Sequence, residues 1–470
     1  MEKFYITTTL PYVNSEPHIG FALEIIRADA LARANVLVGK DVWFNTGTDE
    51  HGQKIFQKAE EMGIQTIEYC NVFADKFKEL KSSLDLSYNT FIRTTDEKHI
   101  KAAQEFWKRC FENGDIYKKN YSVKYCVGCE LEKTDSDLKD GKCPDHPNKE
   151  LEIRDEKNYF FKFSKYQERL TELYKYNSDF VKPDYRMKEI TKFVEAGLSD
   201  FSISRLKAKM PWGVEVPNDP TQVMYVWFDA LVNYISTLDW PQNESQFKEY
   251  WPGVQVCGKD NLRQQTAMWQ AMLMSAKLPN SKKIFVNGFI LSNGQKMSKS
   301  LGNVIDPLTW VEKYSTDAVR YFLLSSISSF DDSDVTEERF REVYTSDLVN
   351  GIGNLTARVA AMVEKSGIKI SESQKTINIE VTNKVNEYMF SEAIDLIWKK
   401  VKEADLTINE RKVWELSGDE QGGVLTNLVE SIRQIAVDLE PFMPKTSEKI
   451  KAQFNVENIK KADHLFGRLT

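Results

Sequence analysis

The sequence predicts an α/β protein in which an open parallel sheet is interrupted by an insertion and is followed by an all-α bundle. Three observations predict it. Short apolar strand patterns alternate with helical patterns in two separate parts of the chain, the stretch between them is rich in turn residues and cysteine, and the last part is almost wholly helical. These changes place the two halves of the sheet domain at 1–118 and 223–336, the insertion at 119–222 and the bundle at 337–470.

The composition is that of a large globular protein. The chain has 470 residues, of which 41% are hydrophobic and 12% aromatic, so it can bury a large core. A formal net charge of −7 argues against a general nucleic-acid coat, although one basic face could still bind a nucleic acid. No run reaches the roughly 18 apolar residues of a membrane span, and the N-terminus lacks the apolar region of a signal peptide. We therefore expect a cytoplasmic protein that does not bind membranes.

The first predicted pair of elements is a strand followed by a helix. β-branched and aromatic residues fill 4–9, Pro11 and Pro17 bracket a loop, and apolar residues then recur at helical spacing. His18 and Gly20 are therefore expected at the N-terminal end of a helix that follows a strand. Ligands of open α/β sheets bind at such junctions, where free N–H groups and the helix dipole favour phosphate. A glycine that only lets the helix pack against the sheet explains this stretch equally well.

Further strands are predicted beyond this first pair. The segments are 42–44, 224–228, 254–257 and 284–286, and the pattern from 53 to about 118 is helical. Polar residues, including Asp49, follow the strand at 42–44, and Gly258 and Asp260 follow the strand at 254–257. A sheet that is interrupted by an insertion and then resumed is the simplest account of this order.

The insertion contains four residues with the spacing of metal ligands. Cys126 and Cys129 form a Cys-x-x-Cys pair, and Cys143 and His146 form a Cys-x-x-His pair after thirteen intervening residues. Two chelating pairs at this spacing satisfy a tetrahedral zinc ion. Four protein ligands leave no position for an activated water, so we expect one structural zinc ion. The alternatives are four unrelated residues or a disulfide.

A second candidate site for phosphate is a lysine-rich loop. The turn-forming stretch 288–295 leads into Lys296-Met297-Ser298-Lys299-Ser300, in which two lysines are flanked by hydroxyl groups. Such a loop can stabilise the charge that grows on a polyphosphate as a bond to phosphorus breaks. Two lysines in a surface loop are more often merely solvated, but the His18 and Gly20 junction favours the phosphate interpretation.

These two motifs carry a resemblance to a known family. Residues 296–300 are the complete KMSKS signature of class I aminoacyl-tRNA synthetases, and residues 18–20 match three of the four residues of their HIGH signature. The chain resembles the methionyl-tRNA synthetases in particular, from about residue 5 to about residue 444, and among them the type with a single Cys3His zinc knuckle. This resemblance implies a Rossmann-like catalytic domain, a connective insertion that contains the knuckle, and a helical domain that binds the anticodon.

The resemblance also implies an activity. It is the ATP-dependent ligation of L-methionine to tRNA(Met) through a methionyl-adenylate intermediate, with release of AMP and pyrophosphate and with Mg²⁺ accompanying ATP. The sequence gives no appended tRNA-binding or dimerisation domain, so we expect a monomer. Synthetases for leucine, isoleucine or valine usually carry a large editing insertion, whereas only about a hundred residues separate the two halves of this sheet.

Roles for individual residues follow from the same resemblance. The residues implied in catalysis are His18, Gly20, Lys296 and Lys299. Those implied in ATP binding are these four with Phe21, Gly258, Asp260, Met297, Ser298 and Ser300. Those implied in methionine binding are Leu10, Tyr12, Asp49, Arg205, Trp227, Ala230, Tyr234 and Asn287. Asp49 would hold the substrate ammonium group, Asp260 would accept from ribose hydroxyls, and the aromatic walls suit a polarizable thioether.

The helical region offers an independent candidate for RNA binding. An apolar stripe recurs at intervals of three and four residues from Leu348 to Met362, and Asn354 and Arg358 lie off that stripe, one turn apart, so both are expected to be exposed. The resemblance implies that this pair contacts anticodon bases and that Trp414 stacks on one of them, as RNA-binding proteins commonly do with unpaired bases.

Four positions depart from the family pattern. Phe21 replaces the second histidine of the HIGH signature, Gln265 and Asn287 stand where histidine is usual, and Val413 replaces a proline before the tryptophan. The first three replacements leave open the alternative that the chain is a catalytically impaired paralogue, which binds tRNA or methionine without ligating them. The lysines of the KMSKS motif and Asp49 favour an active enzyme.

Overall fold

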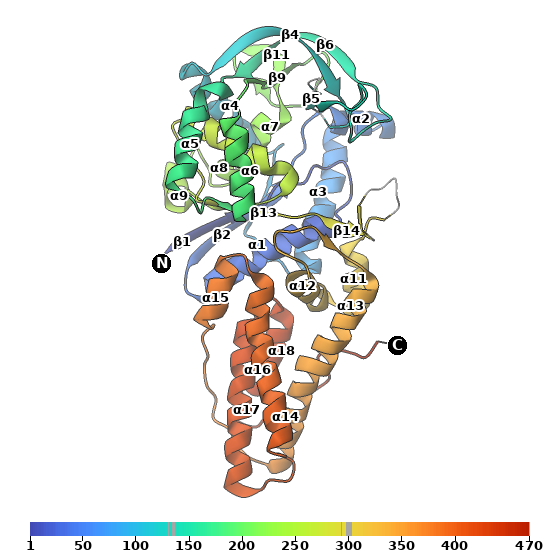
Figure 1. Ribbon diagram of the computed structural model, residues 1–470, viewed down its shortest axis with the longest axis vertical. Coiled ribbons are helices and arrows are strands. Elements are labelled where there is room, and N and C mark those ends of the chain that lie inside the picture. Colours follow the sequence, from blue (N-terminus) through green and yellow to red (C-terminus); the bar gives the residue numbers. More distant parts are fainter. Residues whose placement is uncertain (130, 134–136, 293, 298–302, 470) are drawn as a thin grey trace.

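The computed structural model describes residues 1–129, 131–133, 137–292, 294–297 and 303–469. The molecule is elongated, with a parallel sheet in its middle, antiparallel sheets at one end and a bundle of helices at the other (Figure 1). The predicted class, an α/β domain with an insertion followed by an all-α bundle, is confirmed.

The central sheet has six parallel strands in the order β3-β2-β1-β12-β13-β7. They are β1 (Lys3–Thr7), β2 (Asp41–Thr48), β3 (Thr90–Arg93), β7 (Val181–Lys182), β12 (Val254–Gly258) and β13 (Lys283–Asn287). The chain order reverses between β1 and β12, and open α/β sheets bind ligands beyond the carboxyl ends of strands at such a point. β7 pairs with β13 although it comes from the stretch 119–222.

Two details of the predicted secondary structure are wrong. The run 224–228 is not a strand, because β11 (Asp219–Met224) ends where it begins and the short helix α7 (Val226–Ala230) follows. A short apolar run does not distinguish a buried strand from a buried helix. β3 also interrupts the stretch from 53 to 118, which has a helical pattern on both sides of it.

The two faces of the sheet belong to different apolar cores. Phe4 and Ile6 of β1 pack into one core, which continues into the bundle, and Tyr5 between them packs into the other, because successive strand residues point to opposite faces. The helices of this part of the chain are α1 (Ile19–Leu37), α2 (Gln53–Met62), α3 (Thr66–Ser83), α4 (Glu97–Glu112), α8 (Asn233–Ser236), α9 (Glu244–Tyr250), η3 (Lys259–Asn261), η4 (Gln264–Met268), α10 (Trp269–Ser275), α11 (Pro307–Tyr314) and α12 (Thr316–Ser325).

The remaining strands form three small sheets. Two of them belong mainly to the stretch 119–222, with strand orders β5-β4-β6-β8 and β10-β11-β9, and the third has the order β15-β14-β16. Their strands are β4 (Ile116–Cys126), β5 (Leu131–Lys133), β6 (Glu152–Phe161), β8 (Phe201–Ser202), β9 (Ser204–Leu206), β10 (Glu215–Val216), β14 (Ile290–Ser292), β15 (Gln295–Lys296) and β16 (Ser333–Asp334), and the helices beside them are η2 (Phe163–Tyr166), α5 (Gln167–Tyr176) and α6 (Asp184–Glu195).

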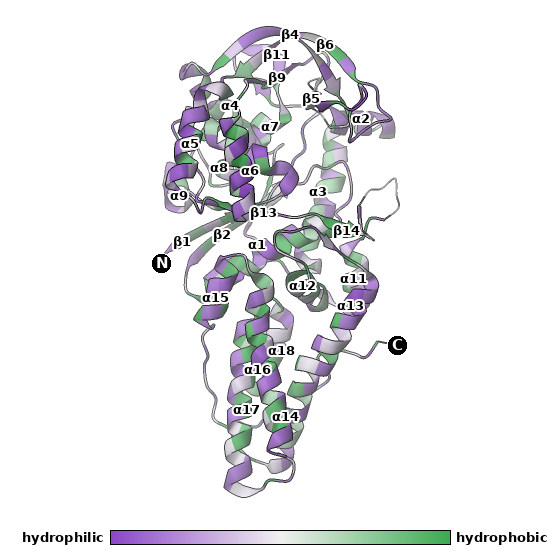
Figure 2. Cartoon of the chain, in the orientation of Figure 1, coloured by the Kyte–Doolittle hydropathy of each residue, from purple (hydrophilic) through white to green (hydrophobic). Residues whose placement is uncertain are grey.

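The C-terminal third is a bundle of amphipathic helices. Hydrophobic and hydrophilic residues alternate along each of them (Figure 2), and the hydrophobic residues pack into the core shared with the sheet. The helices are α13 (Glu337–Val343), η6 (Tyr344–Gly353), α14 (Asn354–Ser366), α15 (Ile379–Asn386), α16 (Phe390–Glu410), α17 (Gly418–Leu439) and α18 (Pro444–Phe454). Among the described residues, no helix combines the length and hydropathy needed to span a lipid bilayer.

Helix α1 joins the sheet to the bundle through buried polar side chains. Asp29 is fully buried and is 2.7 Å from Arg320 Nη2 and 2.8 Å from Arg33 Nε. Burial alone would raise the pKa of Asp29, but these two guanidinium groups outweigh it and hold the pKa below its usual value. Arg320 also donates to the carbonyl oxygens of Pro441 and Phe442, at the start of the last helix of the bundle. The buried ion pair therefore fixes the bundle against α1.

We predict that Asp29→Asn destabilises the protein by about 3 to 5 kcal/mol, because it leaves the buried Arg320 charge without its carboxylate. Urea unfolding measures this loss. Glu61→Gln is the matched control: it removes an exposed carboxylate 2.5 Å from Lys58 and should leave the unfolding midpoint unchanged. Equal midpoints for Asp29→Asn and the parent chain would contradict this role of the ion pair.

Candidate functional site

A cavity of about 640 Å³ lies beyond the carboxyl ends of the central strands. It is bounded by the loop after β1, the start of α1, and the residues that follow β2, β12 and β13. Most of the residues that the sequence assigns to ATP or methionine line it. They are Leu10, Tyr12, His18, Gly20, Phe21, Asp49, Trp227, Gly258, Asp260, Asn287 and Met297.

Three residues predicted to bind methionine do not line this cavity. Arg205 is buried, and its Nη1 donates to Ser202 Oγ at 2.8 Å and to the carbonyl oxygen of Ser204 at 2.7 Å. Tyr234 is buried behind the cavity wall, where its hydroxyl accepts from Gln265 Nε2. The carbonyl oxygen of Ala230 accepts from an asparagine side chain three residues later.

The lysine loop is described only in part. Lys296 pairs through its backbone with Leu291 in β14, and Met297 lines the cavity, so the loop begins at the cavity edge. Ser298, Lys299 and Ser300 lie outside the described residues. The predicted contacts of the two lysines with phosphate therefore remain predictions.

The first turn of α1 is shaped by His18 and Gly20. His18 is the N-cap residue of the helix, and its Nδ1 accepts from the Gly20 N–H at 3.1 Å. A Cβ atom on Gly20 would lie 2.9 Å from His18 Cε1, so a larger residue would displace the imidazole. The N–H groups of this turn already have acceptors, since Ile19 donates to the carbonyl oxygen of Ile305 and Phe21 donates to that of His18. The turn itself lines the cavity, where the positive end of the helix dipole favours an anion.

Phe21 packs beside this turn and offers no hydrogen bond. Its ring meets the ring of Phe77 edge to face, with centroids 5.3 Å apart. The side chain therefore closes one wall of the cavity with apolar surface, at the position where the resemblance implies an imidazole.

The other two positions that lack the expected histidine hold amides with buried partners. Gln265 donates to the Tyr234 hydroxyl and accepts from Gln255 Nε2 at 3.0 Å. Asn287 Oδ1 accepts from Arg27 at 2.9 Å and from the Tyr388 hydroxyl at 3.0 Å. Both amides thus hold neighbouring side chains in place without carrying a titratable group.

The structure adds Glu24 to the cavity, a residue that the sequence analysis missed. Its Oε1 accepts from the Thr9 N–H at 2.8 Å and from the Thr9 hydroxyl. Burial raises the pKa of Glu24 to about 7; the Thr9 hydrogen bonds oppose the rise, as does the Arg27 charge, and Asp260 adds to it. An acidic residue within the otherwise apolar start of a helix is the signal that could have identified it.

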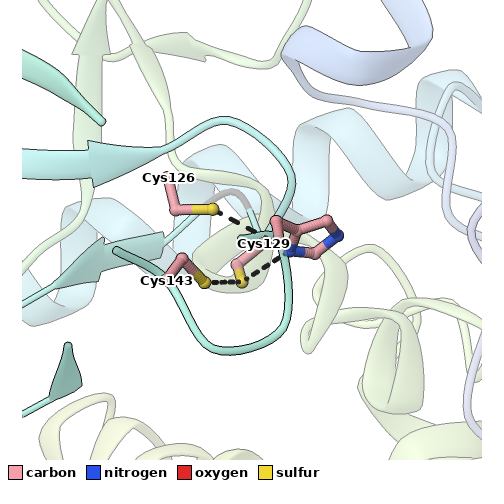
Figure 3. Close-up of side chains that lie close together, drawn as sticks. Cys126, Cys129 and Cys143 are labelled. Atoms are coloured by element: carbon pink, nitrogen blue, oxygen red, sulfur yellow. Dashed lines mark hydrogen bonds between the residues drawn. The ribbon is translucent and has the colours of Figure 1, made fainter. Parts of the chain in front are cut away.

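The four predicted metal ligands come together in one cluster. Their donor atoms all lie within 4.8 Å of one another, and Figure 3 shows the three cysteine sulfurs turned toward a common point. Cys129 Sγ is 3.4 Å from Cys143 Sγ and 3.2 Å from His146 Nδ1. None of the six cysteines, all within the described chain, forms a disulfide. Three thiols and one imidazole in this arrangement suit a tetrahedral metal ion.

The cluster of predicted metal ligands borders the cavity. Cys129 is one of the cavity-lining residues, and Lys54 Nζ of α2 donates to the Gly128 carbonyl oxygen at 2.7 Å. A Cβ atom on Gly128 would lie 2.4 Å from His146 Cγ, so the histidine can approach the cysteines only because this residue is glycine. The two sites therefore share one wall.

The predicted anticodon residues lie in the bundle. Trp414 is 51% exposed in the connection between α16 and α17, at the end of the bundle farthest from the sheet (Figure 1). Asn354 is exposed, as expected. Arg358 is only partly exposed, because its Nη1 lies 3.1 Å from Asp405 Oδ1 and its Nη2 donates to Asn409 Oδ1 at 2.9 Å. The expectation that Asn354 and Arg358 are both exposed is therefore wrong for the arginine.

Comparison with known proteins agrees with this arrangement. A family model described as tRNA synthetases class I (M) matches residues 4–151 and 136–360. A methionine–tRNA ligase of Thermotoga maritima is 42% identical, and the match covers 98% of this chain and 77% of the relative. One from Nostoc is 41% identical, with 96% and 90% covered.

Solved structures give the same result. Mycobacterium tuberculosis methionyl-tRNA synthetase in complex with methionyl-adenylate superimposes with a TM-score of 0.93 at 33% identity, over the whole of both chains. The apo form of that enzyme gives a TM-score of 0.86 at 29% identity, over 100% of this chain and 99% of the other.

We predict that Glu24 makes the stability of the unliganded protein depend on pH. Its folded pKa of about 7 exceeds its ordinary value of 4.5, so the folded state keeps a proton that the unfolded state loses between these values. Stability therefore falls as pH rises through this window, by up to about 3 kcal/mol. Measured from pH 5 to 8, the melting temperature of Glu24→Gln should rise relative to that of the parent chain as pH increases. An equal dependence of the two melting temperatures on pH would contradict the prediction.

Proposed function

Because the chain belongs to the methionine–tRNA ligase family of class I tRNA synthetases, we propose that it ligates L-methionine to tRNA(Met) with ATP, through methionyl-adenylate. The observation that carries this proposal is the cavity at the β1 and β12 reversal, because eleven residues assigned to ATP or methionine from the sequence line it. Nothing in the described structure favours a paralogue that does not ligate.

In the proposed first step a carboxylate oxygen of methionine attacks the α-phosphorus of ATP and pyrophosphate leaves. His18 and Gly20, in the first turn of α1, would contact the phosphates near the positive end of the helix dipole, and Asp49 would pair with the substrate ammonium group. Asp260 would accept from the ribose hydroxyls. Lys296 and Lys299 would stabilise the charge on the leaving pyrophosphate, and Mg²⁺ would accompany ATP.

In the second step a ribose hydroxyl at the end of the tRNA attacks the carbonyl carbon of the adenylate, and AMP leaves. We assign binding of the anticodon to residues 337–470, with Asn354, Arg358 and Trp414 as its contacts. The exposed ring of Trp414 supports this assignment, because a base can stack on it. Residues 1–118 and 223–336 would carry the chemistry.

We also propose that the cysteine cluster holds one structural zinc ion. Cys126, Cys129, Cys143 and His146 would supply all four ligands and so leave no position for substrate. The ion would stabilise the fold of the insertion, residues 119–222, next to the cavity.

Methionine-dependent exchange of pyrophosphate into ATP tests the function directly. The proposal predicts exchange with methionine and none with leucine, isoleucine or valine at the same concentration. No exchange at saturating ATP and methionine would overturn it.

Trp414→Ala should separate the two steps. We predict that aminoacylation of tRNA falls roughly ten- to a hundred-fold from the loss of stacking on a base, while pyrophosphate exchange is unchanged. Tyr176→Ala, which removes an aromatic ring that is 80% exposed on α5, is the control and should leave both activities intact. An equal loss of both activities in Trp414→Ala would show that the tryptophan is structural.

Metal analysis tests the zinc site. We predict about one zinc ion per chain in the parent protein and much less in Gly128→Ala, because the added methyl group displaces His146. Gly422→Ala is the control, since a Cβ atom there meets nothing within 4 Å. Chelation should unfold the insertion before the bundle, and unchanged melting of the metal-free protein would contradict a role in folding.

A further inference from the structure

A tyrosine from the bundle reaches the wall of the cavity. Tyr388 lies between α15 and α16 and is fully buried, and its hydroxyl donates to Asn287 Oδ1 at 3.0 Å. Its ring stacks on Phe285 of β13, with centroids 4.4 Å apart and an interplanar angle of 10°. Its backbone has a φ of +66°, which bulky residues rarely adopt.

The orientation of the Asn287 amide follows from its two partners. Arg27 Nη1 lies 2.9 Å from the same Oδ1 atom, and a guanidinium group can only donate. Burial raises the pKa of Tyr388, so its phenol stays protonated and also donates. Two donors at one position require that the amide oxygen, and not the nitrogen, faces them.

The amide nitrogen is thereby directed away from both partners. Asn287 lines the cavity and is 4% exposed, and its Nδ2 has no hydrogen-bond partner among the described residues. A buried N–H group without an acceptor is unfavourable. A ligand atom in the cavity can supply the missing acceptor.

We propose that Tyr388 is a positioning residue for methionine: it holds the Asn287 amide so that Nδ2 donates to the thioether sulfur of the bound amino acid. The inference rests on the proposed function. A neutral amide N–H suits a weak, neutral acceptor such as a thioether. The phosphates of ATP would instead bind at the first turn of α1, which is the proposed phosphate site. The bundle then completes the amino-acid site as well as contacting tRNA.

Tyr388→Phe tests the proposal, because it removes one hydroxyl and keeps the stacked ring. Pyrophosphate exchange without tRNA should show a KM for methionine raised roughly 3- to 10-fold, with the KM for ATP unchanged. Norleucine, which has a methylene in place of sulfur, should show no such rise. Tyr344→Phe is the matched control, since the Tyr344 hydroxyl donates to the backbone carbonyl oxygen of Gly467, which does not line the cavity, and its loss should change neither KM.

Two further measurements separate positioning from a structural effect. Asn287→Ala should raise the KM for methionine selectively, and adding Tyr388→Phe to it should raise the KM no further, because the tyrosine acts through the asparagine. Additive effects, an equal rise for norleucine, or a rise in the KM for ATP would overturn the proposal. If Tyr388→Phe fails to fold, a selective rise in Asn287→Ala supports the amide contact, and its absence refutes it.

The same assay distinguishes failure of the inference from failure of the proposed function. A parent chain that exchanges pyrophosphate with methionine, while Tyr388→Phe keeps the same KM, refutes only the role of Tyr388. A parent chain with no methionine-dependent exchange, and no binding of methionine by calorimetry, refutes both.

Discussion

Burial of helix α1 determines the polar contacts that hold the sheet and the bundle together. The helix lies between the sheet and the bundle, so charged residues on it, Arg27 and Asp29, have almost no access to water. Such groups are costly to bury unless they have partners. Asp29 pairs with Arg33 and Arg320, and the two Nη atoms of Arg27 donate to Asn287 and to the carbonyl oxygens of 327–329. The partners of this one helix thus fix the position of the bundle.

The same helix forms one wall of the cavity. Its N-cap, His18, lies at the point where the strand order reverses, and its first turn lines the space beyond β1 and β12. Farther along, Glu24 lines the cavity, and Arg27 donates to Asn287, which also lines it. The wall of the cavity and the attachment of the bundle therefore involve neighbouring turns of one helix.

The replacements at histidine positions have a common physical character. Gln265 and Asn287 keep hydrogen-bonding capacity but carry no titratable group, and Phe21 keeps only ring volume, packed against Phe77. A buried carboxyl also lines the cavity, and burial raises the pKa of this group, Glu24, to about 7. The cluster of predicted metal ligands also contributes to the cavity wall. Cys129 lines the cavity, and the Gly128 carbonyl oxygen accepts from Lys54 of α2.

Local sequence pattern was enough to predict the class of fold, the Cys-x-x-Cys and Cys-x-x-His pairs, and the junction of His18 and Gly20, because these depend on spacing and on residues that permit tight turns. The predicted strand at 224–228 is wrong, since a short apolar run does not distinguish a strand from a helix. Glu24 was not identified, because its raised pKa depends on burial. Only the tertiary structure placed Tyr388 beside Asn287 and paired Arg358 with Asp405, because each contact joins residues far apart in the chain. Local pattern specifies elements, whereas the partners of buried polar groups are decided by how those elements pack.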